Sequence, residues 1–195
     1  MDAGWTLNLV AIIAVAFVLQ NLIGAWDSLA FVPSKAFSQP WTFVTSIFMH
    51  ADISHLLFNA FALFLFGSYL ESRVDAKTYI AVFLSAGIVG NLGYMATATN
   101  LNIPGIGASG AVYGIMGALA VLMPNARIYM WFVPMPMILA AFFWAASEAI
   151  GLFFPSNIAR GAHLGGLFLG ILYGLYLRSK YRKVKRRYAV EYSYW

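Results

Sequence analysis

One serine, three histidines and one asparagine have the residue types and spacing that could do chemistry in this chain. Ser109 stands between glycines at the start of an apolar segment. A serine hydroxyl is a weak nucleophile until a neighbouring base removes its proton, and histidine is a suitable base. Nucleophilic catalysis is therefore indicated if the fold brings these side chains together. The other four candidates are His50, His55, Asn59 and His163.

The elements that must position these residues are apolar and helical. Of the 195 residues, 62% are hydrophobic and 10% are charged, and the mean hydropathy is +0.76. These values are typical of membrane proteins. We expect an all-α polytopic membrane protein with six transmembrane helices in one domain, residues 1–195. The helices are expected at about residues 7–24, 53–70, 78–98, 109–123, 135–154 and 162–177, followed by a basic tail, 178–195.

The fourth segment is too short to cross a bilayer. It has 15 residues, or roughly 22 Å of helix, whereas a hydrocarbon core is about 30 Å thick. The preceding loop, residues 100–108, is therefore expected to dip into the membrane. Irregular backbone is tolerated at that depth only where protein buries it or where it lines a water-filled cavity.

Charge predicts the orientation. Seven of the 12 basic residues lie in the tail, and placing both termini in the cytoplasm leaves only Lys35 and Arg160 outside. The positive-inside rule favours this arrangement. The tail is expected to contact anionic lipid rather than nucleic acid. The first segment does not resemble a signal peptide, because no Lys or Arg precedes it, and the absence of cysteine excludes disulfides.

In this orientation the five candidate residues share the outer leaflet. His55 and Asn59 are four residues apart and therefore share a helix face, as do Ser109 and Tyr113. Small residues allow close helix packing in lipid. If the fourth and sixth segments pack along their glycines, Ser109 and His163 come within hydrogen-bond reach. The two glycine stripes are Gly110, Gly114 and Gly117 on one segment and Gly166, Gly170 and Gly174 on the other.

Other interpretations of the same residues are open. Taken singly, each is more often structural: a membrane serine usually bonds to a backbone carbonyl, and histidines often lie at the interface. Together they favour a functional site, because buried ionisable groups are costly in a membrane. A metal site is not favoured, since the chain has no HExxH pattern and Asp52 is the only acidic residue near the histidines. No cofactor is expected.

Three motifs resemble those of the rhomboid family of intramembrane serine proteases, and they occur in the family's order on a six-helix core. The second segment carries His50-x4-His55-x3-Asn59. The fourth carries Gly107-x-Ser109-Gly110-x2-Tyr113, and the sixth carries Ala162-His163-x2-Gly166-x3-Gly170. The resemblance covers nearly the whole chain. Glu71 and Arg73 also resemble the family's acidic and basic pair after the second helix.

The resemblance implies a function and a role for each residue. Ser109 would be the nucleophile and His163 the general base, as a dyad without a third carboxylate. The Ser109 backbone N–H, His55 and Asn59 would stabilise the oxyanion, and Tyr113 would stack on His163. Peptide bonds in or near transmembrane segments of other membrane proteins would be cleaved. The expected location is the plasma membrane of a prokaryote, with the site toward the outer leaflet.

Two positions depart from the family pattern or add to it. Trp41 is followed by Thr42 where the family often has arginine, so the loop of about residues 25–49 is expected to be anchored differently. Glu148, in the fifth segment, is expected to pair with a nearby serine or tyrosine or, alternatively, to tune a gate between the second and fifth segments. Two rival functions stay open: a catalytically inactive rhomboid-like binder and an unrelated transporter, although no internal repeat favours the latter.

Overall fold

The computed structural model describes residues 4–24, 26–130, 132–154, 156 and 158–191, with side chains as far as residue 180. The last four residues of the predicted tail lie outside this range, as do the tail's side chains beyond residue 180. The helices are α1 (Gly4–Ile23), α2 (Trp26–Leu29), α3 (Thr42–Thr45), α4 (Ile53–Ala62), α5 (Ser68–Glu71), α6 (Ala76–Thr97), α7 (Ser109–Leu122), α8 (Met137–Gly151) and α9 (Arg160–Glu191). The shorter elements are the 3-10 helices η1 (Pro33–Lys35) and η2 (Ser46–Phe48), the π-helix η3 (Leu63–Gly67), and strands β1 (Arg127–Met130) and β2 (Val133–Pro136).

The mostly helical fold expected from the sequence is confirmed, with shifted helix ends. α4, η3 and α5 form one run from Ile53 to Glu71. Three helices within the described residues are long and apolar enough to cross a membrane: α1, this run and α6. Two more, α7 and α8, are apolar but shorter. α9 continues well past the predicted end at residue 177 and takes in most of the tail.

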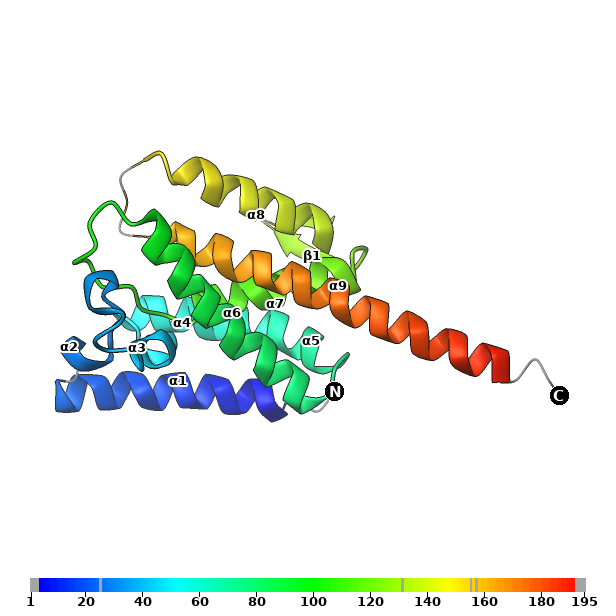
Figure 1. Cartoon of the computed structure of the whole chain (residues 1–195), viewed down its shortest axis with the longest axis horizontal. Coiled ribbons are helices and arrows are strands. Elements are labelled where there is room, and N and C mark those ends of the chain that lie inside the picture. The colour runs from blue at the N-terminus through cyan, green and yellow to red at the C-terminus, as the bar shows by residue number, and fades with distance from the viewer. Residues whose placement is uncertain (1–3, 25, 131, 155, 157, 192–195) are drawn as a thin grey trace.

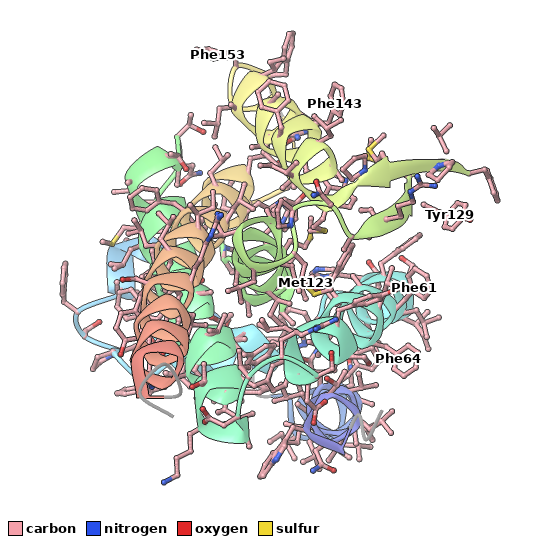
Figure 2. All side chains as sticks on the ribbon, turned by 90° about the vertical axis from the view of Figure 1, so that its right-hand side faces the viewer. Phe61, Phe64, Met123, Tyr129, Phe143 and Phe153 are labelled. Atoms are coloured by element: carbon pink, nitrogen blue, oxygen red, sulfur yellow. The ribbon has the colours of Figure 1, made fainter. Side chains whose placement is uncertain are left out.

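α7 is the central helix. Ten of its residues are buried, including the unbroken stretch from Gly114 to Ala120. It packs most extensively against α9, then α6 and α8. In Figure 2, Met123 just beyond α7 lies near the middle of the view, with α8 above it and α5 below. The nucleophile candidate, Ser109, is the first residue of this enclosed helix.

The predicted contact between the glycine stripes of α7 and α9 is present. A Cβ atom built at Gly166 would collide with the carbonyl oxygen of Gly110, and one at Gly170 would collide with that of Gly114. At Gly117, a Cβ would run into the backbone of Leu167. The two backbones therefore touch directly, which only glycine permits at these positions.

A third helix takes part in this packing, which the sequence analysis missed. A Cβ atom at Gly90 of α6 would lie 2.9 Å from the carbonyl oxygen of Ala162, and one at Gly93 would collide with that of Gly161. From α9, a Cβ at Gly165 would lie 2.7 Å from the carbonyl oxygen of Val89. The start of α9 is therefore held on two sides, by α6 and α7.

The outer surface carries aromatic side chains. Phe61, Phe64, Phe143 and Phe153 are between 49% and 86% exposed, and they point away from the bundle in Figure 2. Exposed aromatics of this density suit contact with lipid rather than water. The loop between α7 and α8 forms an antiparallel hairpin, β1 and β2, which the sequence analysis did not predict.

The molecule has two distinct ends along its long axis (Figure 1). α2, α3 and the loop before α7 lie at one end, and the final turns of α9 extend beyond the bundle at the other. The β-bridge between Phe31 and Gly105 joins the segment that follows α2 to the loop before α7. Its two hydrogen bonds, of 3.2 Å and 2.7 Å, join their backbones directly.

The backbone contact between α7 and α9 predicts a specific sensitivity. Gly170→Ala should lower the thermal unfolding midpoint in detergent, because a methyl group there overlaps the Gly114 carbonyl oxygen and overpacking typically costs about 1–3 kcal/mol. Gly4→Ala is the matched control, since a Cβ at Gly4 meets nothing within 4 Å. Equal midpoints for the two variants would show that the helices separate at no cost.

Candidate active site

Ser109 lies at the start of α7, and the loop before it has a constrained shape. Gly107 has φ +118°, a region that L side chains rarely adopt. A Cβ atom there would also lie 2.8 Å from the His55 ring. The Gly107 N–H donates to the Ser46 carbonyl at 2.9 Å. Glycine is therefore required at this position, and it lets the His55 ring approach the loop that delivers Ser109.

Ser109 and His163 meet at the start of α9. The Ser109 Oγ lies 2.9 Å from the His163 Nε2, which is hydrogen-bond distance. Tyr113, one turn along α7, stacks on the His163 ring with centroids 4.4 Å apart and planes within 3°. A flat ring stacked this closely fixes the plane in which His163 lies.

A carboxylate also contacts His163, although the resemblance implied a dyad without a third carboxylate. Glu148 Oε1 lies 3.0 Å from His163 Nδ1 and accepts a hydrogen bond of 2.8 Å from the Tyr113 hydroxyl. Glu148 Oε2 lies 3.2 Å from a guanidinium nitrogen of Arg160. The predicted pairing of Glu148 with a tyrosine is present, but its partners include the candidate base as well.

The two side chains expected as oxyanion donors, His55 and Asn59, lie on α4 with different surroundings. The Asp52 carboxylate caps this helix by accepting the His55 N–H at 2.8 Å. Hydrogen bonds from the Ser54 hydroxyl and the His55 N–H hold the pKa of Asp52 below its usual value. The buried Asn59 amide donates to the His55 carbonyl at 2.9 Å. The structure therefore places the His55 ring against the Gly107 loop, with Asn59 one turn further along the helix.

No group of three or more histidine, cysteine or acidic side chains suited to a metal occurs among the residues that the structure describes. The geometry that is present instead joins a hydroxyl, an imidazole and a carboxylate. In such an arrangement the imidazole can remove a proton from the hydroxyl and give it to a leaving group.

The sequence matches the family model described as the Rhomboid domain over residues 38–180. That match includes every residue of the site described above. The chain belongs to the rhomboid family.

Similar proteins come from bacteria and from mitochondria. The chain is 31% identical to Rhomboid protein 1, mitochondrial, of Saccharomyces cerevisiae over 153 residues, covering 74% of this chain and 44% of that one. It is 32% identical to Rhomboid protease GluP of Bacillus subtilis, covering 67% and 24%. It is 30% identical to the human Presenilin-associated rhomboid-like protein, mitochondrial, covering 73% and 39%. This rhomboid thus corresponds to less than half the length of each of these three.

His50 has a structural surrounding in this rhomboid. It is fully buried, and its ring lies 5.1 Å from that of His55, centre to centre. The Ala108 N–H points to His50 Nε2 at the long distance of 3.5 Å. Burial lowers the pKa of His50 to about 4, so the ring is neutral near pH 7. A neutral, packed imidazole is suited to supporting His55 and the Ser109 loop.

The side chain that holds His50 was missed from the sequence. Gln20, buried in α1, donates to the His50 carbonyl from its amide nitrogen and accepts the His50 N–H at 3.1 Å. An isolated glutamine within a predicted apolar helix was the available signal, since buried polar side chains in membranes generally have a partner.

The loop that contains Thr42 is anchored by hydrogen bonds to nearby residues and to residues distant in the sequence. Thr42 Oγ1 donates to the Gln39 carbonyl at 2.7 Å, and Trp41 Nε1 donates to the Ser28 carbonyl at 2.7 Å. The Asn91 amide of α6 donates to the Phe43 carbonyl and to the Ser46 hydroxyl, both at 2.9 Å. The carbonyls of Ser28, Gln39 and Phe43 therefore have partners without an arginine at position 42.

Glu71, singled out from the sequence, caps α1. Its two carboxylate oxygens accept the Trp5 N–H at 2.8 Å and the Thr6 N–H at 3.0 Å. A carboxylate at a helix N-terminus is favoured by the helix dipole. Glu71 thus joins the end of the α4–α5 run to the start of α1, far from Ser109.

The amide of Gln20 should contribute measurably to the stability of the folded protein. Gln20→Ala should lower the thermal unfolding midpoint in detergent, because it leaves the buried N–H and carbonyl of His50 unpaired, at about 1–3 kcal/mol for each group. Asn21→Ala is the matched control, since its amide donates to a carbonyl on an exposed face of the same helix. If both variants unfold at the same temperature, Gln20 does not hold His50.

Proposed function

We propose that this rhomboid is an intramembrane serine endopeptidase that hydrolyses peptide bonds in or near transmembrane segments of other membrane proteins. The 2.9 Å separation of Ser109 Oγ and His163 Nε2 carries the proposal. Ser109 is partly exposed, as a residue that contacts a substrate must be. The relative named Rhomboid protease GluP supports the same reaction class.

The first half of the reaction forms an acyl-enzyme. His163 Nε2 removes the proton from Ser109 Oγ as the oxygen attacks the substrate carbonyl carbon. The tetrahedral intermediate collapses when the protonated His163 gives that proton to the leaving amine. The peptide C–N bond breaks, and an ester joins the substrate acyl group to Ser109.

The second half uses water. His163 Nε2 removes a proton from a water molecule, whose oxygen attacks the ester carbonyl, and then returns the proton to Ser109 Oγ. The products are a new carboxylate and the free enzyme, so no cofactor enters the balance. Both halves pass through an oxyanion that needs hydrogen-bond donors already in position.

The proposed donors are the Ser109 N–H, the His55 ring and the Asn59 amide. Ser109 is the first residue of α7, and the N–H groups of a helix's first turn have no partner within the helix. The His55 ring lies against the Gly107 loop that leads to Ser109. Asn59 uses its amide toward the His55 carbonyl, and an amide carries a second N–H for the oxyanion.

The proposed arrangement in the membrane has six spans, with both termini in the cytoplasm. α7 has 14 residues, or roughly 21 Å of helix, so Ser109 would lie below the outer surface. Placing α2 and α3 outside puts the basic part of α9 inside, in agreement with the positive-inside rule. A prokaryotic plasma membrane remains the proposed location, with membrane proteins as substrates and lipid around the bundle.

Removal of either Ser109 or His163 should abolish cleavage. Purified protein in lipid vesicles is incubated with a transmembrane peptide, and fragments are measured by mass spectrometry. Ser109→Ala and His163→Ala should each produce none while unfolding at the parent temperature, because the paired groups act as a unit. Cleavage by Ser109→Ala at the parent rate contradicts a serine mechanism. A folded parent without cleavage of any membrane substrate favours an inactive binder.

The oxyanion assignment predicts a graded loss. Asn59→Ala should lower kcat by roughly 10²-fold, the order seen when one oxyanion donor is removed. Asn21→Ala again serves as the control, because this amide lies on α1 and bonds within its own helix. Equal kcat values for the two variants would remove Asn59 from the oxyanion site.

A further inference from the structure

Glu148 is the acidic residue that lies in the site without a role in the serine–histidine chemistry described above. We propose that Glu148 is a positioning residue that holds the proton of neutral His163 on Nδ1 and stabilises the imidazolium formed when Ser109 is deprotonated. The inference rests on the proposed function, which it extends from a Ser–His pair to a Ser–His–Glu triad.

Both carboxylate oxygens of Glu148 make contacts that support this role. Oε1 lies 3.0 Å from His163 Nδ1 and accepts the Tyr113 hydroxyl at 2.8 Å. Oε2 pairs with Arg160 at 3.2 Å. The Glu148 side chain is only 9% exposed, so water screens these interactions weakly. A carboxylate held at three points has little freedom to turn away from the histidine.

The tautomer of His163 follows from where its two nitrogens lie. Nε2 faces the Ser109 hydroxyl at 2.9 Å, and it must be unprotonated to accept that proton. The single proton of the neutral ring then belongs on Nδ1, which faces the carboxylate. Nδ1 lacks a well-aligned hydrogen-bond partner among the described residues, so we assign the 3.0 Å contact to attraction between the carboxylate charge and the dipole of the Nδ1–H group.

This attraction increases during the reaction. Proton transfer from Ser109 turns His163 into a cation with protons on both nitrogens, next to a carboxylate that was previously opposite a neutral ring. Interactions that are stronger in the transition state than in the ground state raise kcat. Glu148 therefore acts on the rate of the chemical step rather than on substrate binding.

The residues around Arg160 leave room for it beside Glu148 and hold it there. Gly151 follows Glu148 by one turn of α8, and a Cβ atom there would collide with the Arg160 guanidinium. The Arg160 Nε also donates to the Ser156 hydroxyl at 3.3 Å. Glycine at 151 thus leaves the space through which the arginine reaches the carboxylate.

Among the described residues, Glu148 of α8 and Tyr113 of α7 contact the His163 ring. Arg160, in the first turn of α9, pairs with Glu148, and His55 of α4 interacts with His163 electrostatically. Arg160 and a protonated His55 oppose a positive charge on His163, and Glu148 is the group that favours it. Removing the Glu148 charge alone should therefore make the imidazolium less stable.

The test compares Glu148→Gln with the parent protein in two measurements. Glu148→Gln should lower kcat on the order of 10²-fold with little change in KM. The loss should be smaller than the ~10⁴-fold found for an aligned triad carboxylate, because the contact is not aligned and Arg160 offsets part of the charge. The acidic limb of the kcat/KM profile should move to lower pH. Glu148→Asp should restore part of kcat and of the profile.

Glu71→Gln is the matched control, because Glu71 is an acidic side chain bonded to α1 and not to the site. It should keep the parent kcat and pH profile. A Glu148→Gln protein with the parent kcat and profile overturns the inference. So does a lower kcat with an unchanged pH profile and no rescue by aspartate, since a purely structural role predicts that pattern.

A second measurement needs no activity and separates this inference from the proposed function. Nitrogen-15 NMR of histidine-labelled protein, with His163→Ala for assignment, reports which His163 nitrogen carries the proton. The parent should show the proton on Nδ1, and Glu148→Gln should shift the population toward Nε2. An identical tautomer in both proteins overturns the inference, whereas a shift in a protein that cleaves nothing overturns only the proposed function.

Discussion

The backbone contact between α7 and α9 is the constraint on which the site depends. Apolar helices gain little from leaving lipid for each other, so close van der Waals packing must hold them together. Glycines at Gly110, Gly114, Gly166 and Gly170 let the two backbones touch. Because Ser109 opens α7 and His163 lies in the first turn of α9, the same contact sets their 2.9 Å separation. We therefore expect a side chain in this interface to change the separation of Ser109 and His163.

Satisfying polar backbone at membrane depth is the second constraint, and buried amides meet it. Gln20 bonds both backbone groups of His50, and Asn91 bonds the loop around Ser46. Ser46 in turn accepts the Gly107 N–H. These bonds link α1 and α6 to the loop before Ser109, so the irregular segments at the α2–α3 end of the bundle are fixed to rigid helices. A nucleophile needs such support, since a displacement of about 1 Å can cost on the order of 10²-fold in rate.

The features predictable from the sequence were those encoded in local pattern. Apolar length predicted the helices, and glycine spacing predicted the α7–α9 contact. The roles of Ser109 and His163 stay predictions until cleavage is measured. The α6 contribution, the Gln20 bonds and the β1–β2 hairpin were missed, because spacing along one helix does not say which side chain of another helix it meets.

Glu148 shows this limit most clearly. It is 35 residues from Tyr113 along the chain, and nothing in the local pattern of α8 connects it to the other two helices of the site. The resemblance implied a pair without a carboxylate, whereas the structure brings Glu148 Oε1 to 3.0 Å from His163. The Arg160 guanidinium can reach Glu148 only because residue 151 is glycine, and Gly151 belongs to no motif in the sequence. Contacts between side chains of three different helices can be identified only from the three-dimensional structure.

Covalent labelling tests most directly whether His163 makes Ser109 a nucleophile. The folded protein is treated with a fluorophosphonate, and the intact mass and the modified peptide are determined by mass spectrometry. The account predicts one adduct, on Ser109, in the parent protein and none in folded His163→Ala. An adduct on a different residue, or labelling of Ser109 at the parent rate without His163, would contradict it.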